Sequence, residues 1–181
     1  MPLKKPIAMN QQLQSSFQLL EKQREEFSAW VQKAPAVLQH RKPSADQWSA
    51  AQLLFHLAKV DQQVVNGLEK RLGSGKALRP MRLGTRVRSF LLNLFLRLPI
   101  KFKAPPAVSE VPEEVQIPAV IKDWQDTRAR LLVLVSGFPE NQLNREVFFH
   151  PRSGMITLPQ TLRFMLEHTE HHRRQMRRLL S

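Results

Sequence analysis

Two histidines near the C-terminus have a spacing that suits metal binding. His168 and His172 are four residues apart in the stretch TLPQTLRFMLEHTEHHRRQMRRLLS, which covers residues 157–181. In a helix this spacing puts two side chains on one face, about 6 Å apart along the axis. Two imidazoles arranged in this way can share one metal ion. A second interpretation is a basic helix end, where His and Arg interact favourably with the C-terminal dipole.

The stretch around this pair predicts one helix, about 23 residues long, over residues 157–181. Thr157 or Leu158 can cap its N-terminus, and Pro159 suits the first turn, where its missing N–H costs nothing. Both histidines fall in the apolar sector of this helix, so we expect them to point into the fold, with His171 at the sector's edge. The other members of the sector are Leu158, Thr161, Leu162, Met165, Met176, Leu179 and Leu180.

Three further helices are predicted from apolar residues that recur about every 3.6 positions. They cover residues 10–38, 49–72 and 112–136. Ser49 is a good N-cap for the second of them, and Gly73 and Gly75 follow its end. Residues 138–156 are expected to be irregular, with a short extended piece near residue 149 and no sheet. The sequence therefore predicts an all-α fold, a four-helix bundle formed by a single domain over residues 1–181.

A long basic connection joins the second and third predicted helices. Between Arg71 and Ser109 the chain has nine Lys or Arg residues and no acidic residue, within a net charge of +13. Residues 85–98 predict a helix inside this connection. Its apolar side chains could cover a pocket, form a dimer interface or contact a membrane, and we expect a homodimer. These side chains are Phe90, Leu91, Leu94, Phe95 and Leu98.

The positive charge permits attraction to nucleic acid, to an acidic membrane surface or to an anionic small molecule, although a solvated basic surface explains it as well. The sequence has no recognisable nucleic-acid-binding motif, so nucleic acid is not the expected partner. The basic connection follows the helix that carries His56. We therefore expect an anionic small molecule or thiol as ligand, with Arg79, Arg82 and Arg86 contributing to its binding.

The sequence also bears on the cellular compartment. It has no cysteine, which excludes disulfides and thiolate metal ligands and fits a reducing compartment. The first residues, MPLKKPIAMNQQLQ, lack the apolar region of a signal peptide, and no apolar run is long enough to span a bilayer. A cytoplasmic location is the resulting expectation.

His56 offers a third imidazole on the second predicted helix. It lies at the edge of the apolar stripe of that helix, where a lone histidine is usually structural. With His168 and His172 it makes a plausible three-imidazole site between facing helices. Three protein ligands leave a position for water or substrate, as in catalytic zinc sites. Imidazole suits zinc, nickel, copper or Fe(II), and we expect zinc or nickel first.

Two blocks of the sequence resemble the signatures of the DinB-like (DinB/YfiT) superfamily. The first is WSAAQLLFHLAKVD at residues 48–61, and the second is HPRSGMITLPQTLRFMLEHTEHHRRQM at residues 150–176. The resemblance implies a four-helix bundle with a metal held by three histidines, which fall here on His56, His168 and His172. His40, His150 and His171 are then not ligands.

The resemblance also suggests a class of reaction. Characterised relatives include metal-dependent S-transferases and isomerases that use low-molecular-weight thiols such as bacillithiol or mycothiol. The function expected from it is a metal-dependent transferase or hydrolase. Independently of the resemblance, Gln52, Gln63 and Gln175 lie at the predicted lip of the site, where they could orient ligands. The basic connection is not part of the signature, so the substrate cannot be carried over. The alternative is a non-catalytic basic helical bundle that binds nucleic acid or acidic membrane, and binding of that kind should fall steeply with salt.

Overall fold

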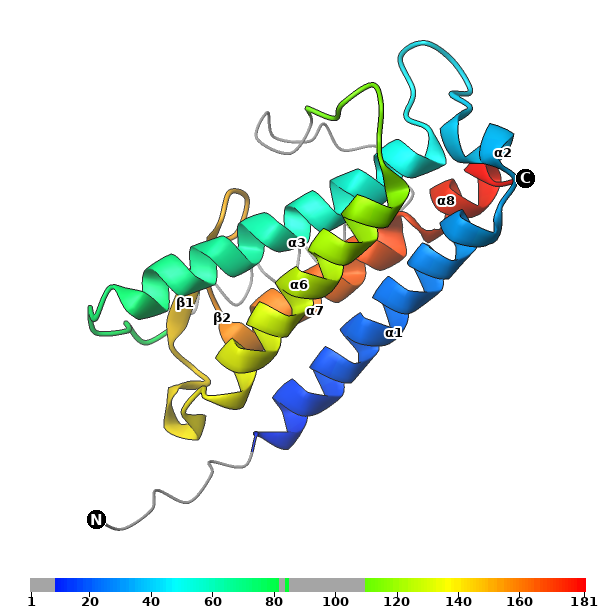
Figure 1. The fold of residues 1–181 in the computed structure, drawn as a ribbon. Helices are drawn as coiled ribbons and strands as arrows, with labels where there is room; N and C mark the ends of the chain where they lie inside the picture. The colour runs from blue at the N-terminus through cyan, green and yellow to red at the C-terminus, as the bar shows by residue number, and fades with distance from the viewer. Residues whose placement is uncertain (1–8, 82–83, 85–109) are drawn as a thin grey trace.

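Helices make up most of the described part of the protein (Figure 1). The computed structural model describes residues 9–81, 84 and 110–181. Four longer helices of this described part lie side by side, namely α1 (Gln11–Lys33), α3 (Ala50–Gly73), α6 (Ile117–Ser136) and α7 (Leu158–His171). The shorter elements are α2 (Ala36–His40), the 3-10 helix η1 (Glu140–Gln142), α8 (Arg173–Leu179), β1 (Glu146–His150) and β2 (Gly154–Thr157). No helix among the described residues is long and apolar enough to cross a membrane.

Capping boxes determine where α3 and α7 begin. Ser49 Oγ accepts the N–H of Gln52 at 3.2 Å, and Gln52 Oε1 accepts the N–H of Ser49 at 3.1 Å. Thr157 and Gln160 make the same exchange at the start of α7, at 3.4 and 3.0 Å. Such a cap satisfies N–H groups that the helix leaves unpaired and stabilises the helix start by about 1 kcal/mol. Both starts agree with the sequence-based prediction.

Prolines change two of the predicted helices. The predicted helix over residues 10–38 is in fact α1 followed by α2, because Ala34 before Pro35 has extended backbone angles, φ −72° and ψ 149°. The ring of a proline disfavours helical angles in the residue that precedes it. The predicted helix over residues 112–136 begins later, as α6, with Pro118 in its first turn, where no N–H is needed.

An antiparallel hairpin of β1 and β2 corrects the all-α prediction. His150 lies opposite Gly154, and the positive φ of Gly154 (72°) is one that glycine adopts without steric cost. An upstream segment runs beside the start of β1. The N–H of Met81 donates to the carbonyl of Asn144 at 3.0 Å, and residues 79 and 146 are joined by a second backbone hydrogen bond of 2.9 Å. The described protein is therefore predominantly helical with one small sheet.

A glycine in α3 allows the hairpin to pack closely. A Cβ atom at Gly67 would lie 2.9 Å from Cε2 and 3.1 Å from Cδ2 of the Phe148 ring, which is closer than carbon atoms pack. The absence of a side chain at this position therefore brings β1 against α3. The hairpin also contacts α7, so it covers one part of the α3–α7 side of the protein.

The C-terminal segment is two helices, α7 and α8, instead of the single predicted helix. His172 lies between them, and its N–H donates to the carbonyl of Thr169 at 3.1 Å, three residues back instead of the four of a regular α-helix. Beyond this break, the Arg173 guanidinium pairs with both carboxylate oxygens of Glu26 at 2.6 and 2.9 Å. This bidentate contact joins α8 to α1.

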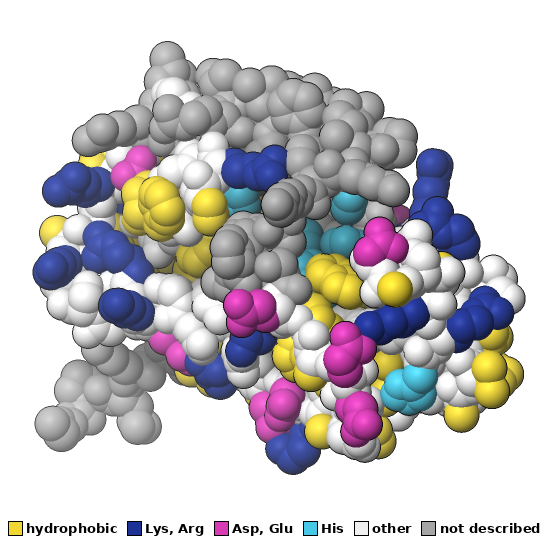
Figure 2. Space-filling view, turned by 90° about the horizontal axis from the view of Figure 1, so that it is seen from above, with side chains coloured by type: hydrophobic (Ala, Val, Ile, Leu, Met, Phe, Trp, Pro, Cys, Tyr) yellow, Lys and Arg dark blue, Asp and Glu magenta, His cyan; other side chains and the backbone are white. Residues whose placement is uncertain are grey.

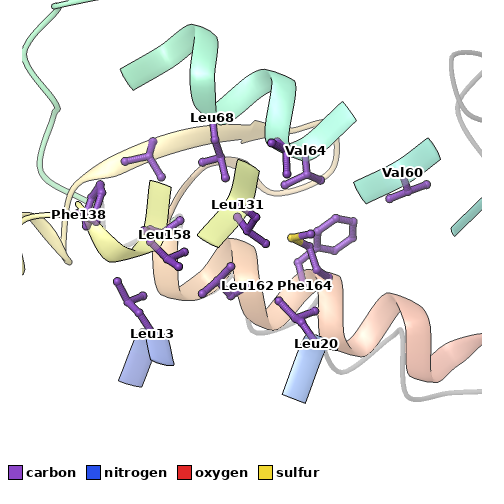
Figure 3. Packing of buried hydrophobic residues seen from close by; sticks show 14 residues of the cluster. Leu13, Leu20, Val60, Val64, Leu68, Leu131, Phe138, Leu158, Leu162 and Phe164 are labelled. Carbon is purple, nitrogen blue, oxygen red and sulfur yellow. The ribbon is translucent and has the colours of Figure 1, made fainter. Parts of the chain in front are cut away.

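The buried hydrophobic residues form two clusters with polar residues between them. Figure 3 shows the first cluster, which draws on α1, α3, α6 and α7 and includes Leu13, Leu20, Val64, Leu131 and Leu162. The second cluster draws on α1, α3, α6 and α8 and includes Phe27, Leu53, Trp124 and Met176. The chain between the two clusters contributes a polar layer, which consists of Glu21, Arg24, His56, Asp61, Thr127, Arg128, His168, Thr169 and His172.

Asp61 and Arg128 form a buried ion pair in this polar layer. Arg128 Nη2 lies 2.6 Å from Asp61 Oδ2, without hydrogen-bond geometry, and the indole N–H of Trp124 donates to the same oxygen. Burial raises the pKa of the Asp61 carboxyl, and the charge of Arg128 opposes that shift. His56 and Asp61 are five residues apart on α3, so at about 100° per residue they point in different directions.

Most of the basic connection lies outside the described residues, including the predicted helix over residues 85–98 and the arginines 82 and 86. Its described beginning follows the far end of α3. Gly73, the last residue of that helix, is about 25 Å from His56 along the helix axis. Arg71 and Lys76 lie in this described beginning, and the expectation that the basic connection folds over the metal position stays a prediction, because most of the connection lies outside the described residues.

Candidate metal centre

Three histidines from two sides of the protein converge in the polar layer. His56 comes from α3, His168 from α7, and His172 from the junction of α7 and α8. One ring nitrogen from each lies within 4.8 Å of the other two. Nε2 of His56 lies 3.4 Å from Nε2 of His168. Nitrogens about 2.0–2.1 Å from a common ion are about 3.3 Å apart in a tetrahedral site, so this spacing is close to that of zinc ligands.

The cluster is accessible although its surroundings are mostly protein. His56 is only 2% exposed, whereas His168 and His172 are partly exposed. Figure 2 shows a group of histidine side chains in a hollow of the surface, with hydrophobic side chains beside them. A ligand bound by these rings would therefore have protein on most sides.

Burial keeps two of the three imidazoles neutral near pH 7. It lowers the pKa of His168 well below the ordinary value, and the neighbouring histidines add to the shift. Burial likewise lowers the pKa of His172 to about 4, with the hydrogen bond to Gln175 acting in the opposite direction. A metal binds the neutral form of imidazole. The donor set therefore fits a divalent ion such as zinc or nickel without first losing protons.

Gln175 orients the His172 ring. Its Oε1 lies 2.9 Å from His172 Nδ1, and because a carboxamide oxygen can only accept, Nδ1 must carry the proton. The lone pair of His172 is then on Nε2. Metal-binding histidines usually donate their other N–H to such an acceptor, which fixes the tautomer and the direction of the ring.

The other predicted lip glutamines have different roles in the structure. Gln52 is buried, and besides its part in the capping box its Nε2 donates to the carbonyl of Pro112 at 2.9 Å. Its amide therefore joins the start of α3 to the segment before α6. Gln63 is exposed on α3. Gln175, through its hydrogen bond to His172, is the lip glutamine that contacts the cluster directly in the ways described above.

His40, His150 and His171 are not members of the cluster. His40 is exposed at the end of α2, and the His171 ring lies beside His172 with centroids 5.2 Å apart. His150 ends β1 in a buried position. That these three histidines are not ligands stays a prediction.

Two aromatic residues contact the cluster, and the sequence alone assigned a role at the site to neither, although Trp48 begins the first block that resembles the family. The Trp48 ring packs on His56 with centroids 4.8 Å apart, and the Phe164 ring lies 5.8 Å from that of His168. Phe164 precedes His168 by four residues, so the helical spacing already places them on one face. Trp48 lies outside α3, before its N-cap, and no periodicity connects it with His56.

The comparison with protein families agrees with this geometry. The model of the DinB superfamily matches residues 19–176, a range that includes all three histidines of the cluster and most of the chain. No curated protein matches the chain. The resemblance noted in the sequence is thus confirmed over residues 19–176, and the chain belongs to the DinB superfamily.

Proposed function

We propose that this protein is a metal-dependent enzyme with a four-helix-bundle fold, in which His56, His168 and His172 hold one divalent ion. The observation that supports it most is the convergence of three ring nitrogens within 4.8 Å from α3 and the α7–α8 segment. Membership of the DinB superfamily supports it as well. Zinc and nickel are the first candidates, because both accept three imidazoles and leave room for a further ligand.

The residues of the cluster and those around it would have different roles in such a site. The three imidazoles bind the ion, Gln175 fixes the direction of His172, and Trp48 packs against His56. A bound divalent metal supplies Lewis-acid chemistry, which lowers the pKa of a coordinated water or thiol. The partial exposure of His168 and His172 is what gives a substrate access to this position.

The proposed reaction is transfer to or from a low-molecular-weight thiol, with hydrolysis as the alternative. A thiol would occupy the remaining position as thiolate, and a hydrolase would activate water there. The net charge of +13 favours an anionic thiol or another anionic small molecule. Calorimetric titration should then show weaker binding of the anionic ligand after neutralisation of Arg79, Arg82 and Arg86.

Elemental analysis of the purified protein tests the metal site. We expect about one equivalent of zinc or nickel per chain, and a loss of that metal in the matched variants His168→Ala and His172→Ala. The controls are His40→Ala and His171→Ala, which should retain the metal. Full occupancy after His168→Ala in a reconstituted sample would show that the ligand assignment is wrong.

The class of function is tested with the cobalt-substituted protein. Addition of a low-molecular-weight thiol should produce a sulfur-to-metal charge-transfer band if the thiol occupies the open position. Metal-dependent turnover without that band would favour a hydrolase. Nucleic-acid or vesicle binding that falls steeply with salt and does not respond to a chelator would favour the non-catalytic binder.

The assembly and location belong to the same proposal. We expect a single domain that forms a homodimer in the cytoplasm. The apolar segment on which the dimer was predicted lies outside the described residues. Light scattering at micromolar concentration is the direct measurement, and a monomeric mass would reject the dimer.

A further inference from the structure

The tip of the β-hairpin is held together by a histidine side chain. His150 Nδ1 accepts the backbone N–H of Arg152 at 3.2 Å and that of Ser153 at 3.3 Å. An acceptor of two N–H groups has its lone pair on Nδ1, so the ring proton is on Nε2. These two hydrogen bonds fix both the tautomer and the orientation of a ring that is buried at the end of β1.

The same ring begins a row of three aromatic rings that ends at a proposed metal ligand. His150 and Phe164 have centroids 4.5 Å apart and planes at 66°, an edge-to-face contact. Phe164 and His168 have centroids 5.8 Å apart at 34°. Aromatic contacts of this kind contribute about 0.5–1.5 kcal/mol beyond burial and restrict how each ring can turn.

Phe164 itself has little freedom to move. It is buried and belongs to the first hydrophobic cluster, beside residues such as Leu162 and Val60 (Figure 3). Phe164 and His168 are one turn apart on α7, so the spacing of their backbone positions is fixed by the helix. What can still vary is the orientation of the Phe164 and His168 rings. The His150 ring, held by the hairpin, restricts that orientation from one end of the row.

The charge state of His150 suits this role. Burial and the nearby Arg152 charge lower its pKa to about 4, so the ring remains a neutral acceptor near pH 7. A proton on Nδ1 would face two backbone N–H groups and could not form these hydrogen bonds. His150 is also outside the group of ring nitrogens that converge within 4.8 Å, so it is not a fourth ligand of the cluster.

We propose that His150 is a positioning residue of the metal centre, which acts through Phe164 on the orientation of the His168 ring. The hairpin is then part of the support of the site as well as a cover of α3. This inference rests on the proposed function, because it assumes that His168 binds a metal. It adds a residue from outside the helices to those that determine the geometry of the centre.

Two substitutions separate the hydrogen-bond acceptor of His150 from its aromatic ring. In His150→Asn, the Asn Oδ1 can replace Nδ1 as the acceptor of the turn, but the ring is lost. In His150→Phe, an aromatic ring remains and the acceptor is lost. Phe164→Leu removes the middle ring and leaves His150 unchanged. Phe149→Ala is the matched control, because the Phe149 side chain is 62% exposed on the same strand.

The measurement is the Co(II) visible spectrum and Co(II) affinity of each folded variant, since the d–d bands report ligand geometry. We expect altered d–d bands in His150→Asn and Phe164→Leu. The Co(II) affinity of both variants should fall about three- to tenfold. This loss is smaller than the roughly 10- to 100-fold loss typical when a group that hydrogen-bonds directly to a metal ligand is removed. The double variant His150→Asn/Phe164→Leu should show no larger change in spectrum or affinity than either single variant, because His150 acts through Phe164. Phe149→Ala should keep the wild-type spectrum.

The outcomes distinguish the two proposals. If wild-type protein binds Co(II) and both His150 variants keep its spectrum and affinity while losing only thermal stability, the positioning role is rejected and the metal site stands. Additive effects of His150→Asn and Phe164→Leu would also reject it. If wild-type protein does not bind Co(II), the proposed metal site fails, and the inference that rests on it fails too.

Discussion

Nε2 of His56 lies 3.4 Å from Nε2 of His168, although 112 positions separate the two residues in the chain. The capping boxes that start α3 and α7 help to set this contact, because each fixes where its helix begins. Two neutral imidazoles with facing nitrogens cannot both donate to each other. A cation between such nitrogens would satisfy both lone pairs.

We expect divalent metal to stabilise the protein through this cluster. At a free zinc concentration 100 times the dissociation constant, the free energy of unfolding should rise by about 2.7 kcal/mol. Thermal denaturation with and without a chelator measures the effect. His56→Ala should abolish the metal-dependent increase in Tm, whereas His40→Ala, altered at an exposed position, should retain it. An equal increase in both variants would show that the ion binds elsewhere.

Gln175→Leu should weaken metal binding while leaving the three ligands in place. The substitution removes the acceptor of the His172 Nδ1–H, so the ring loses its preferred tautomer and direction. Loss of such a partner typically costs roughly 10- to 100-fold in metal affinity. Competition with a chromophoric chelator gives the dissociation constant. Gln175→Glu, which keeps an acceptor, should bind at least as tightly as wild type, and a similar loss in both variants would contradict the hydrogen-bond explanation.

Gly67→Ala should destabilise the protein because of a contact between α3 and the hairpin. The new methyl group would lie 2.9 Å from the Phe148 ring. Overpacking of this kind costs about 1–3 kcal/mol of stability. The better helix propensity of alanine offsets about 1 kcal/mol of that cost. Chemical denaturation measures the change. In a Phe148→Ala background the same substitution should become stabilising. Gly73→Ala is the control, since a Cβ there has no neighbour within 4 Å.

The metal-free protein should lose stability as the pH falls below about 6.5. The pKa values of His150 and His172 are lowered to about 4, and that of His168 is also lowered, whereas unfolded histidines titrate near 6.5. Between these values the unfolded chain binds more protons than the folded chain. The stabilisation is therefore complete above pH 6.5 and decreases toward pH 4, by up to about 1.4 kcal/mol per pH unit for each group.

Urea denaturation of the chelated protein at several pH values measures this slope. His172→Ala should make the dependence shallower by removing one of the groups. Stability that is constant between pH 7 and 5 would mean that these imidazoles are not buried as neutral groups.

The sequence by itself determined the local features of the site. The i, i+4 spacing of His168 and His172 follows from helix periodicity, and the caps at Ser49 and Thr157 follow from residue type. His56 was assigned with the help of the resemblance to a family, since a lone histidine at the edge of an apolar stripe is usually structural. These predictions depend on residues within a few positions of one another.

Tertiary structure alone decided the features that depend on distant partners. The hairpin forms where residues 79–81 run beside β1 and where Gly67 admits Phe148, and no local pattern in a five-residue strand specifies such neighbours. The break at His172 has no glycine or proline to mark it. The position of the ion pair of Asp61 and Arg128 likewise depends on how α3 and α6 pack. Periodicity reports one helix at a time, and side-chain contacts across helices are fixed only when the helices are assembled.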